Sequence, residues 1–256
     1  MIKKRIIPVL TILENKLVKT KKFTNPLVVG NLYNTSKTYN DSDADEIIIL
    51  NINKKNENKI ENLIENLNQI TKYCFMPLAF GGGIRNILHV DKLINNGADK
   101  IILNSICYEE HKIISKISKK YGSQSIIISI DIKYCEKDEE YKLYSNNGTK
   151  LEKVKIHEHI FKVQNEGAGE LFINNIDNDG MKCGYDINLI KNIKQIAKIP
   201  IISCGGAGNF NHIKDLFLDT DISAAACGSL FNFGDNNPVR AKAYLQNYGI
   251  RFRSVK

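Results

Sequence analysis

Two glycine-rich segments of the sequence have the composition of phosphate-binding turns. Residues 81–83 and 205–208 each follow a short apolar run and precede a polar segment with helical spacing. Glycines let a ligand approach the backbone closely, and a helix N-terminus offers free N–H groups with a partial positive charge. The two segments are 124 positions apart, as are Asn104-Ser105 and Gly228-Ser229. This repeat predicts two similar phosphate sites; the alternative is that the glycines only form tight turns.

Asp131 is the best candidate for acid–base chemistry. It follows the apolar run 125–130, and a carboxylate at the end of a buried strand can exchange protons with a ligand. The alternative is a helix cap or a hairpin anchor. Thr11 occupies the equivalent position in the first half of the chain, and its hydroxyl does not exchange protons near neutral pH. The repeat therefore predicts a site with positions for two acids, of which this chain keeps one.

Four charged residues open predicted strands where apolar residues usually seal the base of a barrel: Arg5, Glu46, Lys100 and Glu170. Two acids and two bases at one end of a barrel can form a closed ring of ion pairs, whose attraction offsets part of their desolvation. The functional interpretation is that this ring closes a path along the barrel axis and can open when its ion pairs break. The alternative is four separate, exposed charges.

The elements that must position these residues alternate between apolar runs and amphipathic segments. Strands are expected at about 5–10, 46–50, 76–80, 100–103, 125–131, 170–173, 200–204 and 222–227, and helices at about 33–40, 57–73, 90–95, 110–120, 156–164, 189–197, 213–218 and 239–248. Continuous apolar strands are typical of parallel strands buried on both faces. The sequence thus predicts an α/β protein, a single (β/α)8 TIM barrel over residues 1–256. Its two similar halves are expected at about 1–122 and 123–256.

Two stretches are too long for ordinary connections. Residues 14–30 carry four lysines and Phe23, and we expect a functional or mobile loop after the first strand. Residues 134–149 alternate in polarity and contain the turn-forming segment 146–148. They predict a β-hairpin inserted after the fifth strand.

The composition is that of a globular domain. The chain has 256 residues, of which 43% are hydrophobic, and its six cysteines form no CxxC pair. No apolar run reaches membrane-spanning length, and the run after the basic N-terminus is too short for a signal peptide. The net charge of +8 is spread along the chain, which fits an anionic small molecule better than a nucleic acid. We expect a cytoplasmic protein with no membrane or nucleic-acid partner, no cofactor and no metal.

Nine motifs between about residues 3 and 250 resemble the cyclase subunit family of imidazole glycerol phosphate synthase: Arg5-Ile6-Ile7-Pro8, Gly81-Gly82-Gly83-Ile84, Gly97-Ala98-Asp99-Lys100, Gly122-Ser123-Gln124-Ser125, Ile130-Asp131, Gly167-Ala168-Gly169-Glu170, Ile176-Asp177-Asn178-Asp179-Gly180, Gly184-Tyr185-Asp186 and Gly205-Gly206-Ala207-Gly208. The resemblance implies a (β/α)8 barrel that binds a glutaminase subunit, as a heterodimer, on its N-terminal face. Ammonia would pass through the barrel to a doubly phosphorylated ligand, forming the imidazole of the histidine pathway and releasing an aminoimidazole carboxamide ribotide.

The resemblance also implies roles for individual residues. Asp131 becomes one of two catalytic acids. One phosphate site is assigned to Gly83, Asn104 and Ser105, and a second phosphate region to Asp179, Gly180, Gly206, Gly228 and Ser229. The ammonia gate is assigned to Arg5, Glu46, Lys100 and Glu170. Lys19 and Phe23 are assigned to a mobile loop over the site. The family's second catalytic aspartate is Thr11 here, and its aspartate after the second strand is Asn51.

These departures lead to three interpretations. Residues 6–10 and 69–76 resemble paralogues associated with surface-glycan genes. The favoured interpretation is therefore a specialised barrel that supplies ammonia, with a glutaminase, to a separate sugar amidotransferase. The first alternative is an authentic cyclase, the synthase or lyase subunit of a glutamine amidotransferase complex in histidine biosynthesis. The second is a non-catalytic structural partner of a glutaminase.

Overall fold

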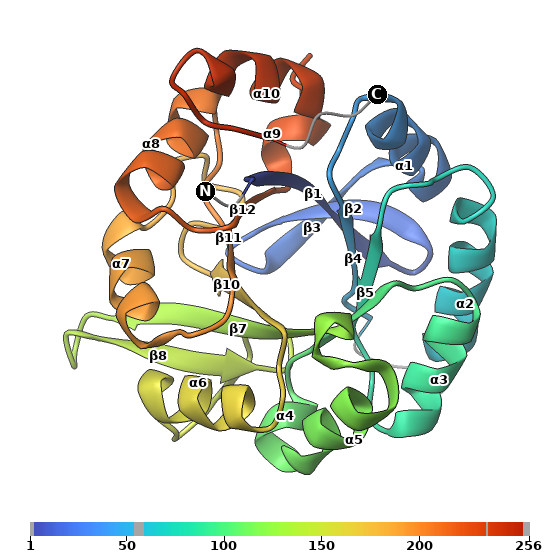
Figure 1. Cartoon of the computed structure of the whole chain (residues 1–256), viewed down its shortest axis with the longest axis vertical. Coiled ribbons are helices and arrows are strands. Elements are labelled where there is room, and N and C mark those ends of the chain that lie inside the picture. Colours follow the sequence, from blue (N-terminus) through green and yellow to red (C-terminus); the bar gives the residue numbers. More distant parts are fainter. Residues whose placement is uncertain (1–2, 54–58, 234, 253–256) are drawn as a thin grey trace.

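The computed structural model describes residues 3–53, 59–233 and 235–252. Eight parallel strands form a closed ring surrounded by helices (Figure 1), which confirms the predicted (β/α)8 barrel. The strands are β1 (Arg5–Leu13), β4 (Ile47–Asn51), β5 (Leu78–Gly81), β6 (Lys100–Leu103), β7 (Ile126–Cys135), β10 (Glu170–Asn175), β11 (Ile201–Cys204) and β12 (Ala224–Cys227). Pairing of β10 with β7 closes the ring.

The helices pack around the outside of this ring (Figure 1). They are α1 (Leu32–Asp41), α2 (Lys59–Ile70), α3 (Ile87–Asn95), α4 (Ile106–Glu109), α5 (Lys112–Tyr121), α6 (Ile156–Asn165), α7 (Ile187–Ile196), α8 (Phe210–Thr220), α9 (Ser229–Asn232) and α10 (Pro238–Gln246). The predicted second helix began at residue 57, and its first two residues lie outside the described ranges. No helix within those ranges is both long and apolar enough to cross a lipid bilayer.

Local sequence signals explain where several helices begin. An Asn or Asp precedes each of five helices, and its side chain accepts a hydrogen bond from the backbone N–H of the third helical residue: Asn31, Asn86, Asp186, Asn209 and Asn237. Such caps satisfy N–H groups that the helix itself leaves unpaired. In α2 the buried residues Ile60, Leu63 and Leu67 recur at helical spacing and face the barrel.

The core has two parts because side chains alternate across each strand. In β1, Ile6 and Leu10 belong to the layer between the barrel and the helices, whereas Ile7 and Val9 fill the barrel interior. Phe172 is another fully buried member of the interior cluster. The strands therefore read as continuous apolar runs because both faces are covered.

The long connection expected at 14–30 contains two strands in the structure. The segment forms an antiparallel hairpin, β2 (Lys16–Lys21) and β3 (Thr24–Gly30), which extends the ladder of β1. Each turn consists of two residues with positive φ: 49° and 62° at Glu14 and Asn15, and 51° and 60° at Lys22 and Phe23. This is the geometry of a tight hairpin turn that normally selects Asn and Gly. Lys22 and Phe23 give no such signal, so sequence reasoning missed the hairpin.

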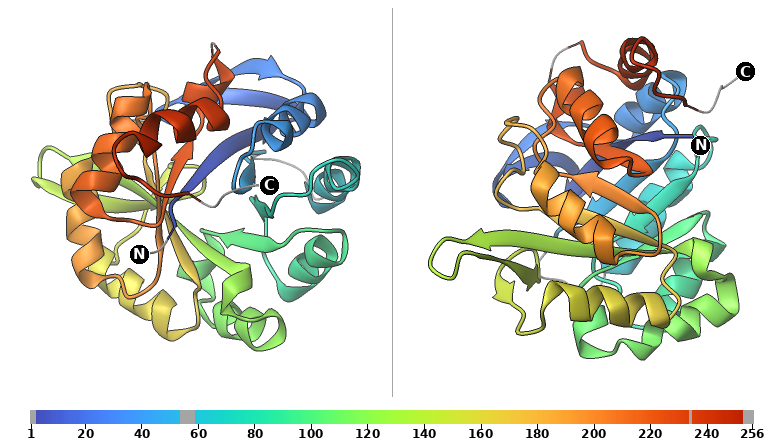
Figure 2. Two further views of the ribbon diagram at one scale, coloured as in Figure 1. Left: turned by 45° about the horizontal axis from the view of Figure 1, so that its top comes forward. Right: turned by 60° about the vertical axis from the view of Figure 1, so that its left-hand side comes forward.

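The second insertion follows the fifth barrel strand. β7 continues past the barrel and pairs with β8 (Glu140–Ser145), which in turn pairs with β9 (Lys150–Leu151). Figure 2 shows the β7–β8 pair projecting beyond the ring of helices. The turn at 146–148 joins β8 to β9, whereas the first hairpin turns at 136–139. This second turn is thereby carried back over the end of the barrel.

Candidate functional site

A cavity of about 1260 Å³ opens at the carboxyl ends of the barrel strands. It is lined by residues that follow strands on every side of the ring, as expected for the functional end of this fold. Its lining includes all the residues to which the resemblance assigned a role at this end of the barrel: Thr11, Lys19, Phe23, Gly83, Asn104, Ser105, Asp131, Asp179, Gly180, Gly206, Gly228 and Ser229. We call this cavity the mouth.

Asp131 is the buried acid of the mouth. Its Oδ2 accepts a hydrogen bond from Asn104 Nδ2 at 2.9 Å, and its Oδ1 accepts one from Ser129 Oγ at 3.1 Å. Burial raises the pKa of Asp131 to about 7, although hydrogen bonds from Ser129, Asn174 and Asn104 lower it. A carboxyl group with a pKa near neutrality can both accept and return a proton.

Two asparagines lie beside Asp131, one of which the sequence analysis did not single out. Asn104 was assigned to a phosphate, but its amide nitrogen donates to Asp131. Asn174 was not singled out, although it is the register partner of Asp131 on the neighbouring strand β10 and lines the mouth. Its position at the end of the sixth barrel strand was visible in the sequence. Its register relative to Asp131 was not.

The glycine turns are required by close backbone packing. A Cβ atom on Gly82 would lie 2.0 Å from the carbonyl oxygen of Asn51, and one on Gly206 would lie 1.8 Å from that of Gly184. Both glycines also have φ above +100°, a region that side chains disfavour. Tight turns therefore account for these glycines, and they equally leave bare backbone at the edge of the mouth.

Lys19 brings a buried positive charge to one side of the mouth. Its Nζ donates to the carbonyl oxygen of Val9 at 2.5 Å, and only 7% of the residue is exposed. A Cβ atom on Gly228 would lie 3.0 Å from this Nζ, so the absence of a side chain there leaves room for the ammonium group. Burial lowers the pKa of Lys19 to about 8, whereas Asp179 raises it. A bound anion near Gly228 would stabilise this cation.

Asp179 fastens the β2–β3 hairpin to the barrel. Its carboxylate accepts hydrogen bonds from Thr20 Oγ1 at 2.7 Å and from the backbone N–H of Phe23 at 3.2 Å. Its carbonyl oxygen accepts one from the backbone N–H of Lys22 at 2.9 Å. Thus Lys19 and Phe23, expected in a mobile loop, belong to a hairpin that Asp179 holds near its tip.

The β8–β9 turn reaches the mouth from the opposite side. The backbone N–H of Asn146 donates to Ser105 Oγ at 3.0 Å, and Asn147 Nδ2 donates to the carbonyl oxygen of Ile52 at 2.9 Å. Both asparagines line the mouth together with Phe23. The two insertions therefore enclose the mouth between them.

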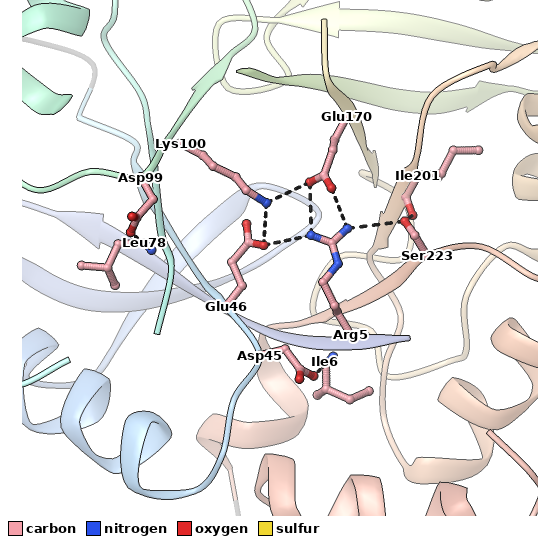
Figure 3. Close-up of polar contacts among 10 residues, drawn as sticks. All are labelled: Arg5, Ile6, Asp45, Glu46, Leu78, Asp99, Lys100, Glu170, Ile201 and Ser223. Carbon is pink, nitrogen blue, oxygen red and sulfur yellow. Dashed lines mark hydrogen bonds and ion pairs between the residues drawn. The ribbon is translucent and has the colours of Figure 1, made fainter. Parts of the chain in front are cut away.

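The other end of the barrel holds the predicted ring of ion pairs (Figure 3). Arg5 binds Glu46 at 2.9 Å and Glu170 at 2.8 Å, and Lys100 binds the same two carboxylates at 2.8 and 3.3 Å. Burial raises the pKa of Glu46, and Lys100 and Arg5 lower it. The apolar interior cluster separates this ring from the mouth.

No group of three His, Cys, Asp or Glu side chains in the described ranges is arranged to hold a metal ion. All six cysteines are free thiols. The polar groups that line the mouth include the charged side chains of Asp131, Lys19, Asp179, Glu109 and Arg85, together with backbone N–H groups, amides and hydroxyls.

Comparison with known proteins gives a consistent picture. Residues 5–237 match the family described as histidine biosynthesis protein. The chain is 38% identical over 253 residues to imidazole glycerol phosphate synthase subunit HisF of Staphylococcus epidermidis, an alignment that covers 99% of this chain and 100% of the relative. It is 36% identical, with the same coverage, to the subunit of that name from Staphylococcus aureus strain Newman.

Proposed function

This chain belongs to the histidine biosynthesis protein family, and we propose that it is the ammonia-using cyclase subunit of a glutamine-dependent synthase. The observation that carries the proposal is the placement of a closed ion-pair ring at one end of the barrel and a large polar mouth with a buried acid at the other. In this function a glutaminase subunit binds the amino-terminal face as a heterodimer partner. Its ammonia enters at the ring and reacts with a phosphorylated ligand at the mouth.

The mouth suits a ligand with a phosphate at each end. One phosphate would bind near Gly83 and Ser105, and the other near Gly206, Gly228 and Ser229. The buried ammonium of Lys19 beside Gly228 supports the second site, because a desolvated cation favours an anion as its neighbour. Gly180 belongs to the same side. Asp179 contributes indirectly, since its carboxylate would repel a phosphate and instead holds the hairpin.

Asp131 is the group proposed to transfer protons while ammonia joins the ligand. Its depth in the mouth and its pKa near neutrality support that role. Thr11 lines the same mouth but offers a neutral hydroxyl. Proton transfer on that side would therefore fall to a group of the ligand or to solvent.

The ring of Arg5, Glu46, Lys100 and Glu170 is proposed as the gate for ammonia. Its four contacts are shared between two cations and two carboxylates, so one cation can move while the other still compensates both acids. The apolar layer above it would admit neutral ammonia far more readily than ammonium, because burying an unpaired charge is costly.

The final acceptor of ammonia has two candidates. The relatives favour the doubly phosphorylated substrate of histidine biosynthesis as the acceptor. That reaction was the first alternative in the sequence analysis. The relatives give no support to a glycan-associated paralogue. Thr11 is the observation that keeps the second candidate, in which the barrel passes ammonia to a separate sugar amidotransferase. A purely structural role beside a glutaminase is the third possibility.

One reconstitution experiment tests the proposal. The chain is combined with a glutaminase of the same family, and formation of imidazole glycerol phosphate and aminoimidazole carboxamide ribotide is measured with glutamine or ammonium salt as nitrogen source. Product from both sources, abolished by Asp131→Asn, is the expected result. Binding of the ligand with glutamine hydrolysis but no product would favour the sugar-amidation role. If the chain neither binds the ligand nor stimulates glutamine hydrolysis, the proposal is contradicted.

A further inference from the structure

Asp131 lies between two asparagine amides supplied by the strands on either side of it. β7 pairs with β6 and with β10. Asn104, directly after β6, donates from Nδ2 to Asp131 at 2.9 Å. Asn174 is the register partner of Asp131 on β10, the strand on the other side, and its side chain lowers the pKa of Asp131. The acid is thus held from both sides, in addition to the contact from Ser129 below it.

The orientation of both amides is informative. The Oδ1 atoms of Asn104 and Asn174 are buried and have no hydrogen-bond partner among the described residues. An unpaired buried acceptor is unfavourable, yet turning either amide around would place its oxygen against the carboxylate. An ionised carboxylate can only accept hydrogen bonds. The arrangement therefore favours the charged form of Asp131, since a negative charge strengthens hydrogen bonds from N–H groups.

We propose that Asn174 is a positioning residue that, together with Asn104, stabilises the ionised form of the Asp131 carboxylate against desolvation and directs it at the mouth. The proposal rests on the proposed function only in treating Asp131 as the acid–base group. We call the side chains of Asn104 and Asn174, on either side of Asp131, the clamp. The family resemblance assigned no role to Asn174.

The surroundings of Asp131 explain why such a clamp matters. Desolvation raises its pKa most strongly, and the carboxylate of Asp179 raises it further. The phenol of Tyr108 on α4 faces the same acid and is itself hard to ionise, because burial raises its pKa. Tyr144 is the register partner of Asp131 on β8. The groups that lower the pKa of Asp131 against this effect of desolvation are Ser129 and the two amides.

The neighbouring Asn175 shows what a structural asparagine looks like on the same strand. Its Nδ2 donates to Asp186 at 3.2 Å and its Oδ1 accepts from the backbone N–H of Asn178 at 3.2 Å. Both of its polar atoms are paired within the scaffold. Asn174 instead has no partner for its Oδ1 among the described residues, and it lies beside the acid in the strand register.

A matched pair of variants tests the clamp. Valine and threonine have nearly the same shape, but only threonine keeps a hydrogen-bond donor. The titration of the Asp131 side-chain carboxyl carbon is followed by ¹³C NMR in the ligand-free barrel, with Asp131→Asn used to assign the signal. Asn174→Val should raise the titration midpoint by about one pH unit, as expected on losing a hydrogen bond to a charged group. Asn174→Thr should raise it by less than half of that.

An unchanged midpoint in Asn174→Val, or equal shifts in the valine and threonine variants, would overturn the proposal. If the valine variant does not fold, the pair Asn174→Ala and Asn174→Ser poses the same question with smaller side chains. The titration needs neither glutaminase nor substrate, so its outcome is independent of the proposed reaction. In the reconstituted complex, the acidic limb of the pH–rate profile should move upward with the same ranking.

Discussion

Phe23, at the tip of the β2–β3 hairpin, lies against Gly148 in the turn between β8 and β9. A Cβ atom on Gly148 would be 3.0 Å from Cδ2 of Phe23 and 3.2 Å from Cδ1 of Ile176. The two hairpins leave the barrel at β1 and β7, which are opposite each other in the order of strands. Their tips thus meet across the mouth, and the contact depends on a residue without a side chain.

We expect Gly148→Val to separate the two hairpins and weaken retention of a ligand in the mouth. A Cβ atom at this position is already unusually close to Phe23 and Ile176, and valine adds two methyl groups, so the neighbouring side chains must move apart. A roughly tenfold loss of affinity for a doubly phosphorylated ligand corresponds to about 1.4 kcal/mol, measurable by calorimetry. Gly249→Val is the control, because Gly249 has φ of +76° against +74° at Gly148 and nothing lies within 4 Å of its Cβ position. Equal affinity losses in both variants would argue against a closing contact.

Lys100→Met should uncouple glutamine hydrolysis from ammonia use while leaving the fold intact. The substitution removes one of the two cations that bind Glu46 and Glu170. Because Arg5 still compensates both acids, a stability loss of about 1–3 kcal/mol is expected. Glutamate release and product formation are measured in parallel. Lys92→Met removes an exposed pair with Glu61 and should change neither. A product-to-glutamate ratio equal to the wild type would speak against a gate at this ring.

Thr11→Asp tests whether the mouth lacks its second acid. Thr11 and Asp131 line the same mouth, and only Asp131 can transfer protons near neutral pH. If the wild-type chain turns over the histidine-pathway substrate poorly, the added carboxylate should raise the rate by about 10²–10⁴-fold. Thr11→Asn, similar in shape but unable to take up a proton, is the control. A rate unchanged by Thr11→Asp, or raised equally by Thr11→Asn, would argue against a missing second acid at this position.

The buried acid should also cost stability in a defined pH window. The pKa of Asp131 rises from an ordinary 3.8 to about 7 on folding, so between these values the folded protein holds a proton that the unfolded chain has lost. Stability therefore falls as pH rises from about 4 to about 7, by up to about 4 kcal/mol in total. Asp131→Asn should be more stable than the wild type at pH 8 and lose this advantage near pH 4.

Denaturant unfolding at both pH values measures that difference. Asp138→Asn is the control, because Asp138 lies at the surface beside Lys142, which lowers its pKa. Its removal should bring no gain at pH 8. An Asp131→Asn variant with the same relative stability at both pH values would mean that Asp131 is not held in a desolvated state.

Much of the architecture was determined by local patterns in the sequence. The apolar runs marked all eight barrel strands, because strands covered on both faces need continuous hydrophobic residues. Arg5, Glu46, Lys100 and Glu170 were recognisable as an ion-pair ring, since strand starts in a closed barrel gather at one end. The glycine repeat and Asp131 marked the opposite end for the same reason.

Only the tertiary structure decided which side chains meet at the mouth. Lys22 and Phe23 carry no turn signal, so the β2–β3 hairpin depends on pairing with β1 and on Asp179, which is distant in sequence. Asn174 faces Asp131 because two strands pair in one register, and a shift of one residue would have presented Asn175 instead. Local composition determines where the eight barrel strands form. The register between strands and the contacts between inserted hairpins arise from long-range packing, which no single stretch of sequence encodes.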